Sequence, residues 1–189
     1  MNDNVHHMNI LVTIDNRYVE PLAMMLRSYI ETNNDSETDL YIAHSSITDE
    51  NLQYIDSIVE GTNVRVHSLR ITEKWFSKTP VLERLPEESF YRLMAFHFLP
   101  EDMDKVLYLD PDIWIRKSLQ PLYDTDLEGK YIAAAAHLRG FQNWFNKRRL
   151  SLKKQDRYVN SGIMMMNLTD AAKATSALKE VILPGMDGQ

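Results

Sequence analysis

The stretch that decides the fold is Lys105-Val-Leu-Tyr-Leu109, followed directly by Asp110-Pro111-Asp112. A short, nearly continuous apolar run is typical of a strand that is buried on both faces, as in a parallel sheet. Open α/β sheets bind their ligands beyond the carboxyl ends of their strands. The segment therefore predicts a central strand with a candidate site at its end.

Strand and helix patterns alternate on the N-terminal side of this segment. Apolar runs at 8–14, 39–43 and 64–69 are typical of strands, and apolar residues at helical spacing follow the first two runs, over 19–30 and 48–59. Thr48 is placed to cap the second of these helices. Strands that alternate with helices indicate an α/β fold with a mainly parallel central sheet.

The segment between Pro86 and Pro100 predicts one helix over 87–99, preceded by a loop over 80–86. Its apolar residues recur at helical spacing. We expect the buried side of this helix to carry Phe90, Leu93, Met94 and Phe98.

Two apolar runs beyond Asp112 predict the last strands. Small residues dominate 131–136, and three methionines fill 163–166, where we expect them to be buried. Thr169 is placed to cap a final helix. Since the sequence contains no repeat, low-complexity tract or linker, we expect a single domain over 1–189.

Composition excludes several classes of protein. Of 189 residues, 44% are hydrophobic and 25% are charged, as in a globular domain. A net charge of -6 argues against a broad nucleic-acid face, and the absence of cysteine excludes disulfides and thiolate metal sites. Residues 1–8 lack the apolar run of a signal peptide, and no run reaches the roughly 20 apolar residues of a membrane span, so a cytoplasmic location is the default expectation.

Asp110 and Asp112 are the candidate metal ligands. In extended backbone, residues i and i+2 point to the same side, so the two carboxylates can converge on one cation. Oxygen ligands of this kind suit Mn²⁺ or Mg²⁺ and leave positions open for phosphate oxygens. The alternative interpretation is a solvated turn, because Asp-Pro-Asp is also good turn composition.

The longer segment reads Asp104-Lys-Val-Leu-Tyr-Leu-Asp-Pro-Asp-Ile-Trp-Ile-Arg-Lys-Ser-Leu-Gln-Pro-Leu122. It resembles the family 8 retaining glycosyltransferases, the group that includes bacterial lipopolysaccharide galactosyltransferases and glycogenin, in which a strand ends in an Asp-x-Asp motif of this form. Similar segments extend over 8–18, 89–93, 123–126 and 158–167. The resemblance implies a GT-A fold, a Rossmann-like nucleotide-binding sheet, which agrees with the α/β pattern.

The resemblance also implies roles for five further residues. Asp15 and Tyr18 would contact the nucleoside, with Tyr18 against the uracil ring, and Arg92 would bind the diphosphate or the donor sugar. Asn160 and Ser161 would hold sugar hydroxyls. The plainer alternatives are a packing role for Tyr18, a surface ion pair for Arg92 and an ordinary turn for Asn160 and Ser161.

The implied activity is metal-dependent transfer of a hexose from a UDP-sugar to a hydroxyl acceptor, a glycan, with retention at the anomeric carbon. Asp110 and Asp112 would hold the cation, and no residue is assigned as the catalytic nucleophile. The family's C-terminal His-x-x-Gly-x-x-Lys-Pro-Trp segment, which supplies a third metal ligand, does not occur here. We therefore expect a shortened domain that binds the UDP-sugar with little or no transfer of its own. His137 stands where relatives commonly carry an acidic residue.

Two other functions fit parts of the pattern. A non-catalytic nucleotide-sugar-binding subunit would need only the donor site. A haloacid-dehalogenase-type phosphohydrolase also places Asp-x-Asp after an apolar strand, but on its first strand, and with Thr or Val where Trp114 stands. Basic residues over 147–157 are compatible with contact to an anionic acceptor or a membrane surface, or with a solvated face.

Overall fold

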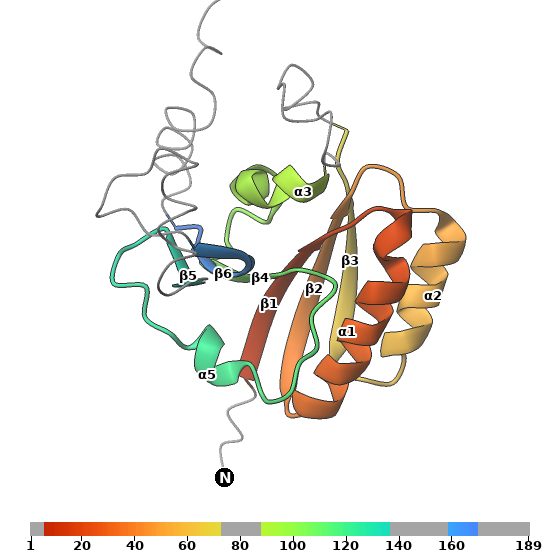
Figure 1. Ribbon diagram of the computed structural model, residues 1–189, viewed down its shortest axis with the longest axis horizontal. Helices are drawn as coiled ribbons and strands as arrows, with labels where there is room; N and C mark the ends of the chain where they lie inside the picture. The colour runs from red at the N-terminus through yellow and green to blue at the C-terminus, as the bar shows by residue number, and fades with distance from the viewer. Residues whose placement is uncertain (1–5, 73–87, 137–158, 170–189) are drawn as a thin grey trace, which may run out of the picture.

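The computed structural model describes residues 6–72, 88–136 and 159–169. Their strands form one six-stranded sheet in the order β3-β2-β1-β4-β6-β5 (Figure 1). The four strands β3, β2, β1 and β4 run parallel to one another. Strand β6 is antiparallel to both of its neighbours, β4 and β5. The prediction of an α/β fold with a mainly parallel sheet is confirmed. The strands are β1 His6–Thr13, β2 Ser36–His44, β3 Val64–Arg70, β4 Lys105–Leu109, β5 Ile132–Ala136 and β6 Val159–Asn167.

The two N-terminal helices cover one face of the sheet, beside β1, β2 and β3 (Figure 1). They are α1 Val19–Thr32 and α2 Asp49–Val59, and a short 3-10 turn, η1 Asn16–Tyr18, leads from β1 into α1. The side chain of Thr48 accepts a hydrogen bond from the Asn51 N–H, which satisfies one of the free donors at the start of α2. Both predicted helices and this cap are confirmed.

The other face is covered by α3 Glu88–Tyr91, η3 Arg92–Met94 and α4 Ala95–Phe98. The prediction of one continuous helix over 87–99 is therefore wrong, because a 3-10 turn interrupts it. The predicted buried side is mostly wrong as well, since Tyr91, Ala95 and Leu99 are the buried residues. Of the four residues predicted to be buried, only Phe98 packs, partly buried, against the cluster that contains these three. Tyr91, Ala95 and Leu99 also recur every four residues, and contact with the sheet decides between the two apolar stripes.

The central strand β4 has the predicted bounds, and its last four residues, 106–109, are fully buried. The backbone beyond it differs from the prediction: Pro111 and Asp112 form a turn instead of extending the strand. Residues 160–162 also differ, because β6 begins at Val159 and includes them, so they are not a turn before the strand. The methionines at 164–166 are buried, as expected.

The segment after Asp112 crosses to α1 before it reaches the short helix α5, Gln120–Tyr123. The Ile115 N–H donates to Ser28 Oγ at 3.0 Å, and the Leu119 N–H donates to Asn33 Oδ1 at 2.7 Å. These two hydrogen bonds attach the segment that follows the Asp110-Pro111-Asp112 turn to Ser28 of α1 and to Asn33 directly after it.

Several predictions concern parts of the chain outside the described residues: the loop over 80–86, the role of His137, the basic stretch 147–157 and the helix expected after Thr169. In the ranges that are described, no helix is both long enough and apolar enough to span a membrane.

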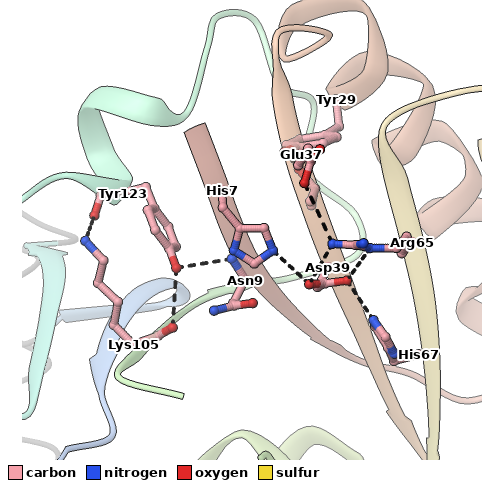
Figure 2. Close-up of polar contacts among 10 residues, drawn as sticks. His7, Asn9, Tyr29, Glu37, Asp39, Arg65, His67, Lys105 and Tyr123 are labelled. Carbon is pink, nitrogen blue, oxygen red and sulfur yellow. Dashed lines mark hydrogen bonds and ion pairs between the residues drawn. The ribbon is translucent and has the colours of Figure 1, made fainter. Parts of the chain in front are cut away.

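Asp39 joins the three N-terminal strands on the sheet face opposite α1 and α2 (Figure 2). Its carboxylate contacts His7 Nε2 on β1 and His67 Nε2 on β3, each at 2.8 Å, and it accepts from Arg65 Nε at 3.0 Å. Burial raises the pKa of Asp39, but the hydrogen bonds from His67, His7 and Arg65 and the charge of Arg65 outweigh burial, so the net pKa lies below its ordinary value of 3.8.

Asp39→Asn is expected to lower the free energy of unfolding by about 1–2 kcal/mol at pH 7, because the ionised carboxylate loses its donors. Because the pKa of Asp39 is lower in the folded state, its carboxylate stabilises the fold fully at pH values above its ordinary pKa of 3.8. This stabilisation is lost as the pH falls through the pKa of the folded state. Urea denaturation of wild type and variant should therefore give a difference that shrinks below pH 4. Glu37→Gln is the control, since Glu37 lies 3.9 Å from Arg65 and is 55% exposed. An Asp39→Asn effect that is independent of pH would contradict this account.

Candidate functional site

A cavity of about 130 Å³ lies at the carboxyl ends of β1 and β4. Its position is the one expected for the ligand site of an open α/β sheet. Five of the seven predicted site residues line it: Asp15, Tyr18, Arg92, Asp110 and Asp112. Ligand pockets usually measure about 300–1,000 Å³, so the described walls enclose part of the space that a whole nucleotide sugar needs.

Asp110 is held by two donors at the end of β4. Its Oδ1 accepts hydrogen bonds from Tyr108 Oη at 2.7 Å and from Arg92 Nη1 at 2.9 Å. The same Nη1 donates to the main-chain oxygen of Ser161 on β6 at 2.9 Å, and the guanidinium carbon lies 4.5 Å from the centre of the Tyr108 ring. The Asp110 carboxylate therefore has a fixed position before any ligand arrives.

Tyr108 orients this carboxylate. Burial raises the pKa of Tyr108 above its ordinary value, and the phenol therefore remains a hydrogen-bond donor at neutral pH. Its proton points to Asp110, and Thr13 Oγ1, 3.3 Å from the phenol oxygen, can donate to it from β1. The chain Thr13–Tyr108–Asp110 thus ties the ends of β1 and β4 together.

Gly162 leaves the room that the Asp110 side chain occupies. A Cβ at position 162 would lie 2.5 Å from Asp110 Oδ2 and 3.1 Å from Asn160 Oδ1, and the first distance is shorter than a non-bonded contact allows. The Asp110 N–H also donates to the Gly162 oxygen at 2.7 Å. The close approach of β6 to the Asp110 carboxylate therefore requires glycine.

Asp110 and Asp112 both line the cavity, although a turn at Pro111 and Asp112 brings them there instead of an extended strand. No group of three or more His, Cys, Asp or Glu side chains that could hold a metal ion occurs in the described parts of the chain. Two carboxylates fit a hard cation such as Mn²⁺ or Mg²⁺ when water and phosphate oxygens fill its other positions. The donor chemistry of the cavity is therefore compatible with the predicted metal.

Asp15 and Tyr18 form the wall at the end of β1. Asp15 caps η1: its Oδ1 accepts from the Arg17 N–H at 2.8 Å, and its Oδ2 accepts from Arg17 Nη2 at 2.6 Å. Burial raises the pKa of Asp15, but the bonds and charge of Arg17 outweigh it and the net pKa is lowered, so this carboxylate is ionised at neutral pH. The Tyr18 side chain is 40% exposed, which leaves much of its ring uncovered beside the cavity.

Asn160 and Ser161 are placed differently from the prediction. They lie on β6 next to Asp110, but they are not among the residues that line the cavity. Asn160 Oδ1 accepts from the Gly162 N–H at 2.8 Å, and Ser161 contacts Arg92 through its main-chain oxygen. Ser161 therefore contacts the Arg92–Asp110 pair directly, whereas Asn160 contacts the neighbouring Gly162.

Two titratable residues of the cavity wall, Glu88 and Tyr108, were not predicted from the sequence. Glu88 precedes Arg92 by four positions, the spacing that places two side chains on one helix face, and its Oε1 accepts from Ser45 Oγ beyond β2. Tyr108 precedes Asp110 by two positions, the spacing that places two strand residues on one side. Both spacings were present in the sequence.

A second hollow, of about 510 Å³, lies beside the segment that follows Asp112. Apolar side chains, including Trp114 and Ile163, line most of it, and none of the described residues that line it carries a carboxylate. It therefore lacks the metal-binding chemistry of the first cavity.

The mainly parallel sheet, with helices on both faces and a cavity at the ends of β1 and β4, is a GT-A fold. The solved structure of galactosyltransferase LgtC, in complex with donor and acceptor sugar analogues, has the same fold: its TM-score is 0.76 at 23% identity, over 93% of this chain and 66% of that one. The chain belongs to glycosyl transferase family 8, which it matches over residues 9–182.

Two lipopolysaccharide glycosyltransferases are similar to this chain in sequence. Lipopolysaccharide 1,2-glucosyltransferase of Escherichia coli K12 is 24% identical over 167 residues, which cover 88% of this chain and 49% of the relative. Lipopolysaccharide 1,3-galactosyltransferase of Salmonella typhimurium is 22% identical over 163 residues, which cover 85% and 48%. The chain thus spans about half the length of these relatives.

Proposed function

We propose that this chain is the donor-binding part of a glycosyltransferase that transfers a hexose from a UDP-sugar to a hydroxyl acceptor, a glycan, with retention. The observation that carries the proposal is one cavity lined by Asp110 and Asp112 together with Tyr18 and Arg92. Its walls combine metal-ligating oxygens, an aromatic ring and a guanidinium, which are the groups that a nucleoside diphosphate needs.

Each wall of the cavity has a proposed role. Tyr18 lies against the base of the nucleotide. Asp15 caps η1 and so fixes the backbone that carries Tyr18 at the nucleoside side of the cavity. Arg92 pairs with the diphosphate or the donor sugar, and Asn160 and Ser161 hold the Arg92–Asp110 pair or sugar hydroxyls. Asp110 and Asp112 hold Mn²⁺ or Mg²⁺, and such a cation would neutralise charge on the departing diphosphate.

Membership of family 8 favours glycosyl transfer over phosphate ester hydrolysis, although Asp-x-Asp follows a strand in both. The position of β4 agrees, because two strand-helix units precede it and it lies in the middle of the sheet. A nucleotide-sugar binder without turnover would share the donor site, so binding and transfer require separate assays.

A thermal-shift panel tests the proposal. UDP-glucose, UDP-galactose, UDP, GDP-mannose and a generic phosphomonoester would be compared with Mn²⁺ and with a chelator. A ligand that binds the native state raises the melting temperature, by an amount set by its concentration relative to Kd. We expect a rise with UDP compounds that requires Mn²⁺. Shifts that are equal with and without metal, or that are confined to the phosphomonoester, would refute the proposal.

Tyr18→Ala is expected to weaken UDP binding by roughly 1–3 kcal/mol, the usual contribution of stacking between a base and an aromatic ring. Tyr18→Phe keeps the ring and should bind UDP nearly as tightly as wild type. Calorimetric titration with UDP in the presence of Mn²⁺ measures both. If the alanine variant binds UDP with unchanged affinity, Tyr18 has only a packing role at the start of α1.

A further inference from the structure

The guanidinium of Arg92 already lies at the carboxylate that the proposed function assigns to a metal ion. Its side chain is 15% exposed and that of Asp110 is 32% exposed, so solvent screens this pair only in part. Its contacts include Asp110 Oδ1, the main-chain oxygen of Ser161 and the ring of Tyr108. Arg92 is therefore a built-in cation, because an arginine side chain does not deprotonate in a protein.

We propose that Arg92 is the resident counter-cation of Asp110, and that it keeps a divalent cation weakly bound until a nucleotide diphosphate is present. This inference rests on the proposed function, because it takes the diphosphate and the metal as ligands of the same cavity. It gives a physical reason why the metal ion would bind tightly only together with the nucleotide.

The charges of the three side chains give the reason. Among the charged side chains that line the cavity, Asp15 is paired with Arg17, and Glu88 accepts a hydrogen bond from Ser45. The proposed ligands Asp110 and Asp112 contribute two negative charges, and Arg92, which contacts Asp110, contributes one positive charge. These three side chains therefore offer one net negative charge to a cation that carries two positive charges. The affinity of an oxygen-ligand site depends on how many charged ligands face the cation. A divalent cation that binds without nucleotide would therefore share Asp110 with the positively charged Arg92, which weakens its binding.

A diphosphate reverses this balance. It adds at least two negative charges, and guanidinium pairs strongly with phosphate oxygens through two parallel N–H groups. Arg92 can then pair with phosphate as well as with Asp110, while the cation shares both. Arg92 thus opposes the metal alone and favours the metal together with the nucleotide, which is a positive coupling between the two ligands.

A plainer cause of weak metal binding would be the small number of protein ligands. In that case the site would bind Mn²⁺ no better after loss of the Arg92 charge, and worse if the loss disturbed Asp110. The two causes therefore predict opposite changes in the affinity for Mn²⁺ alone.

The test is a titration with Mn²⁺, followed by the electron paramagnetic resonance signal of free Mn²⁺, with and without UDP. Wild type would be compared with Arg92→Gln and Arg92→Met, which remove the charge, and Arg92→Lys, which keeps it. Arg27→Gln removes an arginine from the exposed side of α1 and is the matched control. The same titrations without protein correct for Mn²⁺ bound by UDP in solution.

We expect both neutral variants to bind Mn²⁺ alone at least ~10-fold more tightly than wild type, and the enhancement of Mn²⁺ affinity by UDP to fall at least ~10-fold. The lysine variant should bind Mn²⁺ alone as wild type does, and so should Arg27→Gln. If a neutral variant is unstable, Mn²⁺ alone should raise its melting temperature by more than it raises that of wild type.

Mn²⁺ affinities of the neutral variants that are equal to or weaker than wild type, with no larger thermal shift, would overturn the inference and leave the proposed function standing. An equal gain in Arg92→Lys would overturn it too, because the charge would then be irrelevant. A wild type that binds UDP without regard to Mn²⁺ would remove the proposed function and this inference together.

Discussion

Asp110→Asn and Asp112→Asn are each expected to remove the metal-dependent part of UDP binding, a loss of at least ~100-fold in affinity, or about 3 kcal/mol. Each substitution replaces a charged oxygen ligand by a neutral amide on the wall of the cavity. Calorimetric titration with UDP, in Mn²⁺ and in chelator, measures the effect. The chelator titration should be nearly the same for wild type and both variants.

The two variants should differ in stability. Asp110→Asn takes the carboxylate from the partly buried pair with Arg92 and should lower the free energy of unfolding by about 1–3 kcal/mol. Asp112 is exposed, and its substitution should change stability by less than about 0.5 kcal/mol. Asp102→Asn, at an exposed carboxylate outside the cavity, is the control for both measurements. UDP affinity in Mn²⁺ that is equal in wild type and both site variants would rule out this metal site.

Gly162→Ala has the second largest expected effect. Its methyl group would lie 2.5 Å from Asp110 Oδ2, so the carboxylate must move away from Tyr108 and Arg92 or β6 must shift. Overpacking of this kind costs about 1–3 kcal/mol of stability. Because Asp110 is a proposed metal ligand and would be displaced, we expect Mn²⁺-dependent UDP affinity to fall at least ~10-fold, measured by the same titration.

Gly61→Ala separates the two consequences. Gly61 has a φ of 73° with no atom within 4 Å of an added Cβ, so alanine there strains the backbone and meets no side chain. It should cost about 1 kcal/mol of stability and leave UDP binding unchanged. If Gly162→Ala also lowers stability but binds Mn²⁺ and UDP as wild type does, Gly162 has no part in placing Asp110.

Local sequence patterns were enough to predict an element where a single physical requirement, such as burial or helix capping, determined its bounds. The strand at 105–109 was predicted to the residue because a buried run is bounded by Asp104 and Asp110, whose charges resist burial. The cap at Thr48 was predicted for a similar reason: a hydroxyl satisfies a free N–H at the start of α2. Neither prediction depended on distant parts of the chain.

The predictions that failed depended on contacts between distant segments. The helix over 87–99 carried two apolar stripes, and only the position of the sheet selects the one with Tyr91 and Ala95. The contact between Gly162 and Asp110 depends on the pairing of β4 with β6, which no spacing along the chain reveals. The cavity could be located from the sequence, and the spacing of Tyr108 to Asp110 was visible there, but the contacts of Asp110 with Arg92 and Gly162 were not.

Anomalous diffraction at the manganese edge, from crystals grown with Mn²⁺ and UDP, tests the central claim most directly. We expect one strong manganese peak within about 2.5 Å of carboxylate oxygens of both Asp110 and Asp112, with the diphosphate bound to the same ion and the base beside Tyr18. A manganese peak elsewhere on the protein, or UDP bound in this cavity with no metal at Asp110 and Asp112, would contradict it.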